Sequence, residues 1–476
     1  MQLVSAARSR GMELTVAQVF QSPVLRDLYK CVEQNTSLVN GNNGRISVEE
    51  VDPVKQKEIK DILRKYQVGA IFEATDFQAL AISEHTVGNA GLVMYMTIAF
   101  NQKVEKSLVR SAYQHAVDTT EMMRVAFVQY DDRVYQAILN SFTGPFEECV
   151  SSQNLVDFCE SLIKDERRKA LALNEPPLKS WFVEGASSDT LIIRLSHAQY
   201  DGLSLPLLLQ QLKGHSLDCE LDGSKTREMS YYSAALQSLD KSPSINYWRG
   251  LLAESTMPIL PTRPSPERQR MTGNAVRSVI PSFKNLRAGT TSATYVKAAW
   301  AIALARLCGR TDVVFGQLVS GRSVPIKGIE DVVGPCVNFV PIRVNTGCKW
   351  ETVLDQLQAQ QVSTLPHEHL GFETVFKECT NWPLDEHQRP RFSTILQYQN
   401  QPDACHSTTM HGAECQITYE ATPANITDVW AVVEPQGDKL HIIAGYLEEV
   451  IDSTTVQRLL DYFVEALRGM QEGKAI

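Results

Sequence analysis

The sequence has no excess of positive charge and no long hydrophobic run. Its 476 residues include 46 Lys and Arg against 55 Asp and Glu, a formal net charge of -9. Proteins that bind nucleic acids usually carry a basic excess, so we expect no nucleic-acid partner. The most apolar helix-like run, residues 298–305, lies between Lys297 and Arg306. It is far shorter than the roughly 20 residues that span a bilayer, so we expect no membrane contact.

Paired cysteine motifs are also missing. The 10 Cys are scattered without a C-x-x-C pair, and the N-terminus has no apolar signal-peptide core. This pattern argues against a disulfide framework and favours isolated thiols in a reducing, cytoplasmic setting. The phosphate-binding motif G-x-x-x-x-G-K-[ST], the dinucleotide motif G-x-G-x-x-G and the hydrolase motif G-x-S-x-G are absent. Nucleotide binding and serine-hydrolase chemistry therefore lack sequence support.

What is present is a mixed α/β pattern. The length suggests about three structural units, and from about residue 68 strand-like and helix-like segments alternate to the end. The expected strands include residues 90–100 and 190–195, and the expected helices include residues 106–119, 155–173, 203–212, 292–308 and 454–471. An alternation of this length is too long for one compact core and predicts two lobes. A polar break at residues 238–243 divides the segment into these two lobes, which are of comparable size.

The N-terminal part has a different character. Residues 1–35 read as short helices; Thr15 and Gln18 form a capping box that would start one of them. Residues 36–67 read as a linker. Its centre is the Asn- and Gly-rich stretch at residues 40–44, and its second half contains a helix that starts at Asp52. A helical piece of this size cannot close a core by itself, so we interpret it as a fragment of a larger domain.

One strand-to-loop junction carries the strongest candidate chemistry. The strand at residues 190–195 runs into residues 196–204, SHAQYDGLS. His197 would stand where the strand ends, a position that exposes an imidazole to a cleft. Asp201 would fix the loop through a buried Arg, and Gly202 would let the backbone turn. On pattern alone, H-x-x-x-D-G favours a buried structural histidine and an Asp that caps the next helix.

Two other candidates are weaker. His367, Glu368 and His369 supply ligand types that zinc prefers, but their H-x-H spacing in an irregular stretch gives little support for a metal site. Cys336 lies in an apolar segment, where a small buried thiol is more common than a nucleophile. We therefore expect no metal and no catalytic cysteine.

The motif at residues 196–204 resembles the core motif of nonribosomal peptide synthetase condensation domains, which is two His, three variable residues, then Asp-Gly. Ser196 replaces the first His, as in the terminal, macrocyclising condensation-like domains of fungal synthetases of the fumiquinazoline type. Further segments resemble family motifs in the right order: residues 121–127 (EMMRVAF), 247–248 (YW), 312–316 (DVVFG), 320–322 (SGR), 333–338 (VGPCVN), 367–373 (HEHLGFE) and 392–400 (FSTILQYQN). The stretch 367–373 resembles His-Gln-Asp-x-Pro-Phe-Glu, which also argues against zinc. Residues 392–400 resemble the late strand that crosses between lobes.

The resemblance implies an α/β fold with two chloramphenicol-acetyltransferase-like lobes in a V. It assigns residues 68–240 to the N-terminal lobe and residues 241–476 to the C-terminal lobe. Residues 1–35 resemble the C-terminal half of a thiolation (carrier) domain, a small all-helical piece. The Ser that bears 4′-phosphopantetheine would lie upstream of Met1, outside this chain.

The resemblance also implies roles for the site residues. His197 would act as base or positioning group for an amine, and the Gly202 N–H would face the developing oxyanion. Asp201 would be structural and paired with Arg322. The remaining expected positions, lining a substrate tunnel, are Ser196, Tyr200, Ser204 and Asn338.

The implied activity is release of a carrier-bound peptidyl thioester by intramolecular amide formation. The implied partners are the peptidyl thioester on the upstream carrier and the other domains of the same synthetase. Three alternatives stay open: an internal, chain-elongating condensation domain, a catalytically silent docking module, and a stand-alone acyl-CoA transferase.

Overall fold

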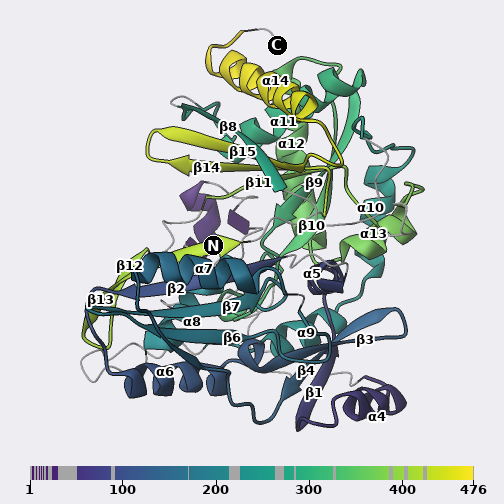
Figure 1. Ribbon diagram of the computed structural model, residues 1–476. Coiled ribbons are helices and arrows are strands. Elements are labelled where there is room, and N and C mark those ends of the chain that lie inside the picture. The colour runs from purple at the N-terminus through teal and green to yellow at the C-terminus, as the bar shows by residue number, and fades with distance from the viewer. Residues whose placement is uncertain are drawn as a thin grey trace.

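Figure 1 shows the computed structural model. It describes residues 51–86, 92–169, 171–213, 226–262, 273–283, 286–324, 328–384, 390–400, 406–421 and 426–474, with residues 24–30 and isolated positions among residues 3–19. Most of the expected carrier fragment, its Thr15 capping box and the centre of the linker lie outside the described residues. The described positions near the N-terminus include a small buried apolar cluster of Val4, Ala7, Leu14 and Leu28.

The lower lobe in Figure 1 is built on a six-stranded sheet with the order β12-β13-β2-β7-β6-β5. Its strands are β2 (Val93–Phe100), β5 (Glu147–Val150), β6 (Lys179–Glu184), β7 (Asp189–Ser196), β12 (Ser407–Met410) and β13 (Ala413–Ala421). Side chains alternate between the faces of a strand. Met94 and Met96 accordingly pack with α6 (Lys106–Thr119) and α8 (Leu205–Lys213), whereas Tyr95 packs with α7 (Leu155–Glu166) on the other face.

A smaller sheet extends the same lobe. It has the order β1-β4-β3, with β1 (Val68–Glu73), β3 (Val125–Tyr130) and β4 (Arg133–Leu139). Helix α4 (Pro53–Ile62) packs on this sheet through Ile59. The lobe also contains α5 (Asp76–Thr86), the short helix η1 (Glu121–Arg124) and α9 (Met229–Gln237).

The upper lobe contains a second six-stranded sheet with the order β10-β9-β11-β14-β15-β8. Its strands are β8 (Gly273–Pro281), β9 (Asp312–Val319), β10 (Asn338–Asn345), β11 (Thr394–Tyr398), β14 (Val429–Gln436) and β15 (Lys439–Leu447). One face is covered by α11 (Ser292–Cys308), α12 (Trp350–Thr364) and α14 (Ser453–Gln471). The remaining helices are α10 (Ser242–Leu252), α13 (Phe372–Cys379), η2 (Ile329–Asp331) and η3 (Leu365–His367).

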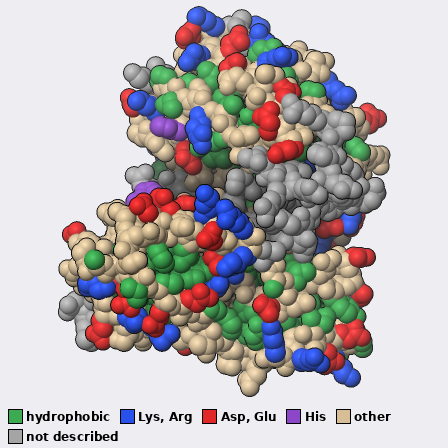
Figure 2. Space-filling view, in the orientation of Figure 1, with side chains coloured by type: hydrophobic (Ala, Val, Ile, Leu, Met, Phe, Trp, Pro, Cys, Tyr) green, Lys and Arg blue, Asp and Glu red, His purple; other side chains and the backbone are tan. Residues whose placement is uncertain are grey.

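One hydrophobic cluster runs through both lobes. It contains Phe72 and Phe77 from the lower lobe together with Trp248, Val314 and Phe339 from the upper lobe. The lobes therefore share a core at their junction, where α5, α10 and α13 lie in Figure 1. Away from this junction the surface is hollowed between the two lobes (Figure 2).

The α/β class and the two sheet-containing lobes predicted from the sequence are confirmed. The predicted lobe boundary at residues 240 and 241 lies between α9 and α10. Among the described helices, none combines the length and the apolar character that crossing a bilayer demands.

Two sequence predictions are wrong in detail. Residues 392–400 do not cross between lobes: their strand β11 pairs in parallel with β9 and β14 inside the upper sheet. The crossing is made by β12 and β13, because β13 pairs antiparallel with β2 and adds Ile417 to the lower core. The expected helix at residues 155–173 ends at Glu166. The buried Glu166 carboxylate contacts Lys169, Lys179 and Arg194, which fixes the chain in a turn at that point.

The crossing strand yields a stability prediction. Replacing Ile417, which is 1% exposed, by Ala is expected to lower the free energy of unfolding by about 2–5 kcal/mol, because it leaves a cavity in the lower core. The adjacent Gln416 is exposed on the same strand, and Gln416→Ala is expected to change it by less than about 0.5 kcal/mol. Urea denaturation of both variants measures the difference; equal effects would contradict the crossing.

Candidate active site

The candidate site is built at the end of β7. Ser196 is the last residue of that strand, and the His197 N–H donates to the carbonyl of Leu92 at 2.7 Å. The loop is then tied to the lobe by Gln199, whose Oε1 accepts from the Ser196 N–H at 2.9 Å and whose Nε2 donates to the Met122 carbonyl at 2.6 Å. These bonds hold the histidine in one place relative to the sheet.

The His197 imidazole has a defined tautomer. Its Nδ1 lies 3.0 Å from the carbonyl oxygen of Tyr200, which can only accept a hydrogen bond. Nδ1 therefore carries the proton and Nε2 keeps its lone pair. The ring stacks on Tyr200 with centroids 4.5 Å apart and meets the edge of Phe77 at 5.0 Å. Burial lowers the pKa of His197 below 6.5, so a neutral imidazole with a basic Nε2 is the form present at neutral pH.

Asp201 and Arg322 form a buried ion pair across the lobe junction. The Arg322 Nη2 contacts Asp201 Oδ1 at 3.0 Å and Oδ2 at 2.9 Å, and both side chains are almost completely buried. Arg322 also donates to the carbonyls of Ile329, Val332 and Gly334 at 2.8–3.0 Å. One guanidinium thus fixes the loop after His197 to the loop between β9 and β10.

Asp201 has a second task. Its Oδ1 accepts from the Leu203 and Ser204 N–H groups at 3.1 and 2.8 Å, and Ser204 Oγ accepts from the Asp201 N–H at 2.8 Å. This reciprocal cap starts α8. Its Oδ2 accepts from the Cys336 N–H at 3.0 Å. The two sequence-level alternatives for Asp201, helix cap and partner of a buried Arg, both hold.

The four residues expected to line a substrate tunnel lie in the scaffold of the site. They are 0–8% exposed, and the set is Ser196, Tyr200, Ser204 and Asn338. Ser196 Oγ accepts from the Ala198 N–H at 3.2 Å. Asn338 Nδ2 donates to the carbonyls of Glu368 and Leu370 at 2.9 and 2.8 Å. The polar side-chain atoms of Ser196, Ser204 and Asn338 are thus hydrogen-bonded within the protein. Gly202, by contrast, is partly exposed in the turn after Asp201.

The residues considered for zinc do not converge. His367 Nδ1 and His369 Nε2 lie 3.0 and 3.4 Å from Ser244 Oγ. The Glu368 carboxylate instead points to Gln361, at 3.5 Å. Among the described residues, no group of three or more His, Cys, Asp or Glu is arranged to hold a metal ion. Burial raises the pKa of Cys336 to about 12, which keeps it a thiol.

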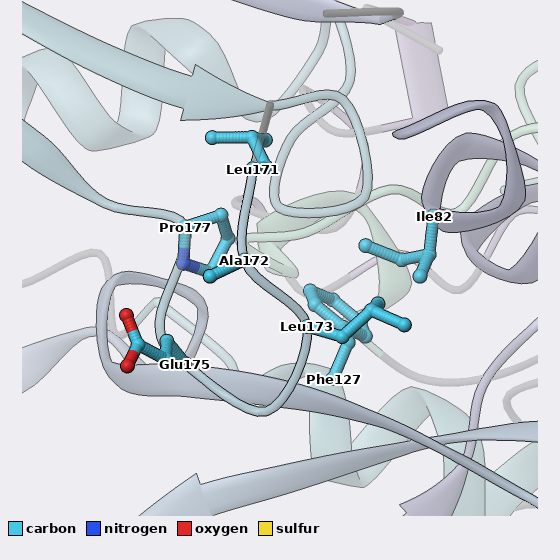
Figure 3. Close-up of a pocket in the computed structure, with 7 residues that line it drawn as sticks. All are labelled: Ile82, Phe127, Leu171, Ala172, Leu173, Glu175 and Pro177. Atoms are coloured by element: carbon cyan, nitrogen blue, oxygen red, sulfur yellow. The ribbon is translucent and has the colours of Figure 1, made fainter. Parts of the chain in front are cut away.

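A small cavity lies elsewhere in the lower lobe (Figure 3). Its volume, including its open mouth, is about 240 Å³, and its lining residues are Ile82, Phe127, Leu171, Ala172, Leu173, Glu175 and Pro177. In Figure 3 the side chains of Ile82, Phe127 and Leu173 point toward one another. Glu175, its one carboxylate, pairs with Lys65. None of the candidate site residues lines it.

The sequence reasoning missed α5. Phe77 contacts the His197 ring, and Gln78 Nε2 donates at 3.1 Å to the carbonyl of Ala198, the residue after His197. The sequence pattern that could have predicted this helix is Thr75-x-x-Gln78, a capping box that marks where α5 starts.

Comparison with known proteins identifies the family. Residues 71–473 match the protein family described as Condensation domain. The chain belongs to the condensation-domain family. This condensation domain is 31% identical over 410 residues to the nonribosomal peptide synthetase apmB of Penicillium brevicompactum, an alignment that covers 84% of the chain. It is 28% identical over 450 residues to the nonribosomal peptide synthetase fmqA of Aspergillus fumigatus, covering 93% of the chain.

These relatives are much longer. The chain spans 17% of apmB and 11% of fmqA, so it matches only one part of each of these synthetases. Solved structures agree on the fold. The condensation domain is similar to a protein described as CT, with a TM-score of 0.76, 23% identity and coverage of 90% of this chain and 97% of that one. It is also similar to the starter condensation domain of rhizomide synthetase RzmA, with a TM-score of 0.66, 16% identity and coverage of 84% and 94%.

The buried ion pair of this condensation domain yields a stability prediction. Asp201→Ala is expected to lower the free energy of unfolding by about 3–5 kcal/mol, because it leaves the Arg322 charge buried without a partner. The exposed pair of Arg306 and Glu465, 2.8 Å apart, is the control: Glu465→Gln is expected to cost less than about 1 kcal/mol. Urea denaturation measures both. Full stability of Asp201→Ala with complete loss of activity would contradict a structural role for Asp201.

Proposed function

We propose that this condensation domain releases a peptidyl thioester from a phosphopantetheine arm by intramolecular amide formation, giving a cyclic peptide. The observation that carries the proposal is the His197 imidazole: neutral, fixed as the Nδ1–H tautomer by Tyr200 and left with a basic Nε2. Ser196 in place of the first motif His supports the terminal type, and the similarity to CT supports the fold.

The proposed reaction needs a proton acceptor and good alignment. The peptide's own amine attacks the thioester carbonyl, the N–C bond forms, and the C–S bond breaks. The amine proton passes to His197 Nε2 and from there to the departing sulfur. Because a thioester is already activated, alignment of the two ends supplies much of the rate, up to about 7–11 kcal/mol. A positioned base adds roughly 10²–10⁴-fold.

The surrounding residues have supporting roles in this proposal. The Gly202 N–H, in the partly exposed turn, is the candidate donor to the developing oxyanion. Asp201 and Arg322 hold the turn at the lobe junction. The peptide would arrive on an upstream carrier domain, whose C-terminal half residues 1–35 resemble. The proposed chemistry uses no metal.

The base role predicts a pH dependence. Because burial lowers the pKa of His197 below 6.5, Nε2 is unprotonated at neutral pH, so kcat/KM should be flat above pH ~6.5 and fall on acidification. As the pH falls, His197 binds a proton more readily in the unfolded chain than in the folded one, because its pKa is lower in the folded state. The free energy of unfolding should therefore decrease as the pH falls below ~6.5. Release rates on a carrier-loaded substrate between pH 5 and 8 measure the first effect.

Substitution tests the same residue. His197→Gln is expected to lower kcat by about 10²–10⁴-fold, whereas His115→Gln, at an exposed position on α6, should leave it unchanged. Product release by His197→Gln at the wild-type rate would rule out a catalytic role for His197.

A product assay tests the proposed function itself. Short synthetic peptides are loaded on a phosphopantetheinylated carrier fused to this chain, and the products are separated by mass. We expect cyclic peptides, smaller than the hydrolysis product by one water. A requirement for a second loaded carrier would show an internal, elongating domain instead. Release that is the same with and without this domain would show a docking module, and turnover of free CoA thioesters would show a stand-alone transferase.

A further inference from the structure

The first turn of α5 contacts the candidate site and both lobes. It begins with a capping box: the Thr75 N–H donates to Gln78 Oε1 at 3.0 Å, and the Gln78 N–H donates to Thr75 Oγ1 at 3.2 Å. Two reciprocal bonds fix the geometry of this turn. The two residues between them, Asp76 and Phe77, therefore project in defined directions.

Asp76 reaches the upper lobe. Its Oδ2 accepts from the Glu373 N–H at 2.7 Å, so an α5 carboxylate caps the N-terminus of α13. The fit depends on Gly371, the residue at the N-cap position of α13: a Cβ there would stand 2.3 Å from Asp76 Oδ2 and 2.6 Å from its Cγ. In the motif that residues 367–373 resemble, Pro occupies this position and carries such a Cβ. This chain has the one residue that leaves room for Asp76.

Phe77 contacts both the upper lobe and the candidate site. Its ring lies 5.7 Å from that of Phe339 on β10, and Phe339 lies 5.7 Å from Phe372, the residue before Glu373. The same Phe77 ring meets the His197 imidazole edge-on at 5.0 Å. Gln78 then bonds the carbonyl that follows His197, at 3.1 Å. One helical turn thus touches α13, β10, the ring of His197 and the backbone of Ala198.

We propose that Asp76 is a positioning residue: by capping α13 across the lobe junction it sets the first turn of α5, and through Phe77 and Gln78 it sets the orientation of the His197 ring. The inference rests on the proposed function for its catalytic consequence, but its structural part stands independently of the reaction. The lobe junction then acts on catalysis through α5, since a shift of α13 relative to the lower lobe displaces the ring that faces the substrate.

Four variants of the full chain test this proposal. Asp76→Ala removes the cap, whereas Asp76→Asn keeps an oxygen that accepts from Glu373 N–H. Gly371→Ala introduces the Cβ that meets the carboxylate, and the double variant Asp76→Ala with Gly371→Ala removes the atoms that this Cβ would meet. Asp52→Ala is the matched control, because Asp52 caps α4 in the same way, accepting from the Val54 N–H at 2.9 Å. Burial raises the pKa of Asp76 to about 6, so assays at pH 8 keep it ionised.

The first readout is the His197 ring itself. In protein labelled at its 10 His, with His197→Gln for assignment, NMR reports the ring's chemical shifts and tautomer without any turnover. We expect the His197 signals to move or broaden in Asp76→Ala and in Gly371→Ala, to return in Asp76→Asn, and to stay unchanged in Asp52→Ala. This measurement keeps its meaning if the product assay shows that the domain does not cyclise peptides.

The second readout is kinetic. We expect Asp76→Ala and Gly371→Ala each to lower kcat about tenfold with little change in KM, because a misplaced catalytic group slows the chemical step. We expect Gly371→Ala to add no further loss in the Asp76→Ala background, since contacting residues are not additive. The proposal is overturned if Asp76→Ala leaves both the His197 signals and kcat at wild-type values, or if the Gly371→Ala loss is the same with and without Asp76.

Discussion

The buried contact between Asp201 and Arg322 is the constraint on which the site depends. Two opposite charges buried 2.9 Å apart repay the loss of their hydration only when the geometry is close and further hydrogen bonds surround them. Here three carbonyls accept from the Arg322 guanidinium and three N–H groups donate to the Asp201 carboxylate. Among the described residues, the buried Arg322 Nε has no hydrogen-bond partner. The carbonyls and one N–H belong to the upper lobe and the other N–H groups start α8 in the lower lobe. Neither the loop after His197 nor the loop before β10 can move without exposing a charge to an apolar core.

The two lobes are held by more than that pair. The hydrophobic cluster that contains Phe77, Trp248 and Phe339 extends through both, and β13 crosses to complete the lower sheet beside β2. Trp248 Nε1 donates to the His367 carbonyl at 3.2 Å, which fixes α10 against the segment after α12. Apolar burial supplies the adhesion at this junction, whereas the ion pair and the α13 cap determine its register.

Sequence reasoning predicted some features of the site and not others. The apolar run before Ser196 predicted the strand end that presents His197, and the family resemblance supplied Arg322 as the partner of Asp201. The hydrogen-bond partners of the expected tunnel residues could not be predicted. The motif that contains Asn338 does not show that its amide donates to the carbonyls of Glu368 and Leu370. Likewise, the apolar segment at residues 392–400 fits a central strand of either sheet, and only its pairing with β14 identifies it as part of the upper one.

By itself the sequence determined the local elements of this condensation domain: which runs form strands, where capping residues start helices, and that a histidine follows a strand end. These depend on hydrogen bonds and side-chain periods between near neighbours in the chain. The tertiary structure decided which distant elements meet at that histidine. The bond from Glu373 to Asp76 joins residues 297 positions apart, and no local pattern specifies such a contact, because it follows from how the two sheets pack as whole bodies.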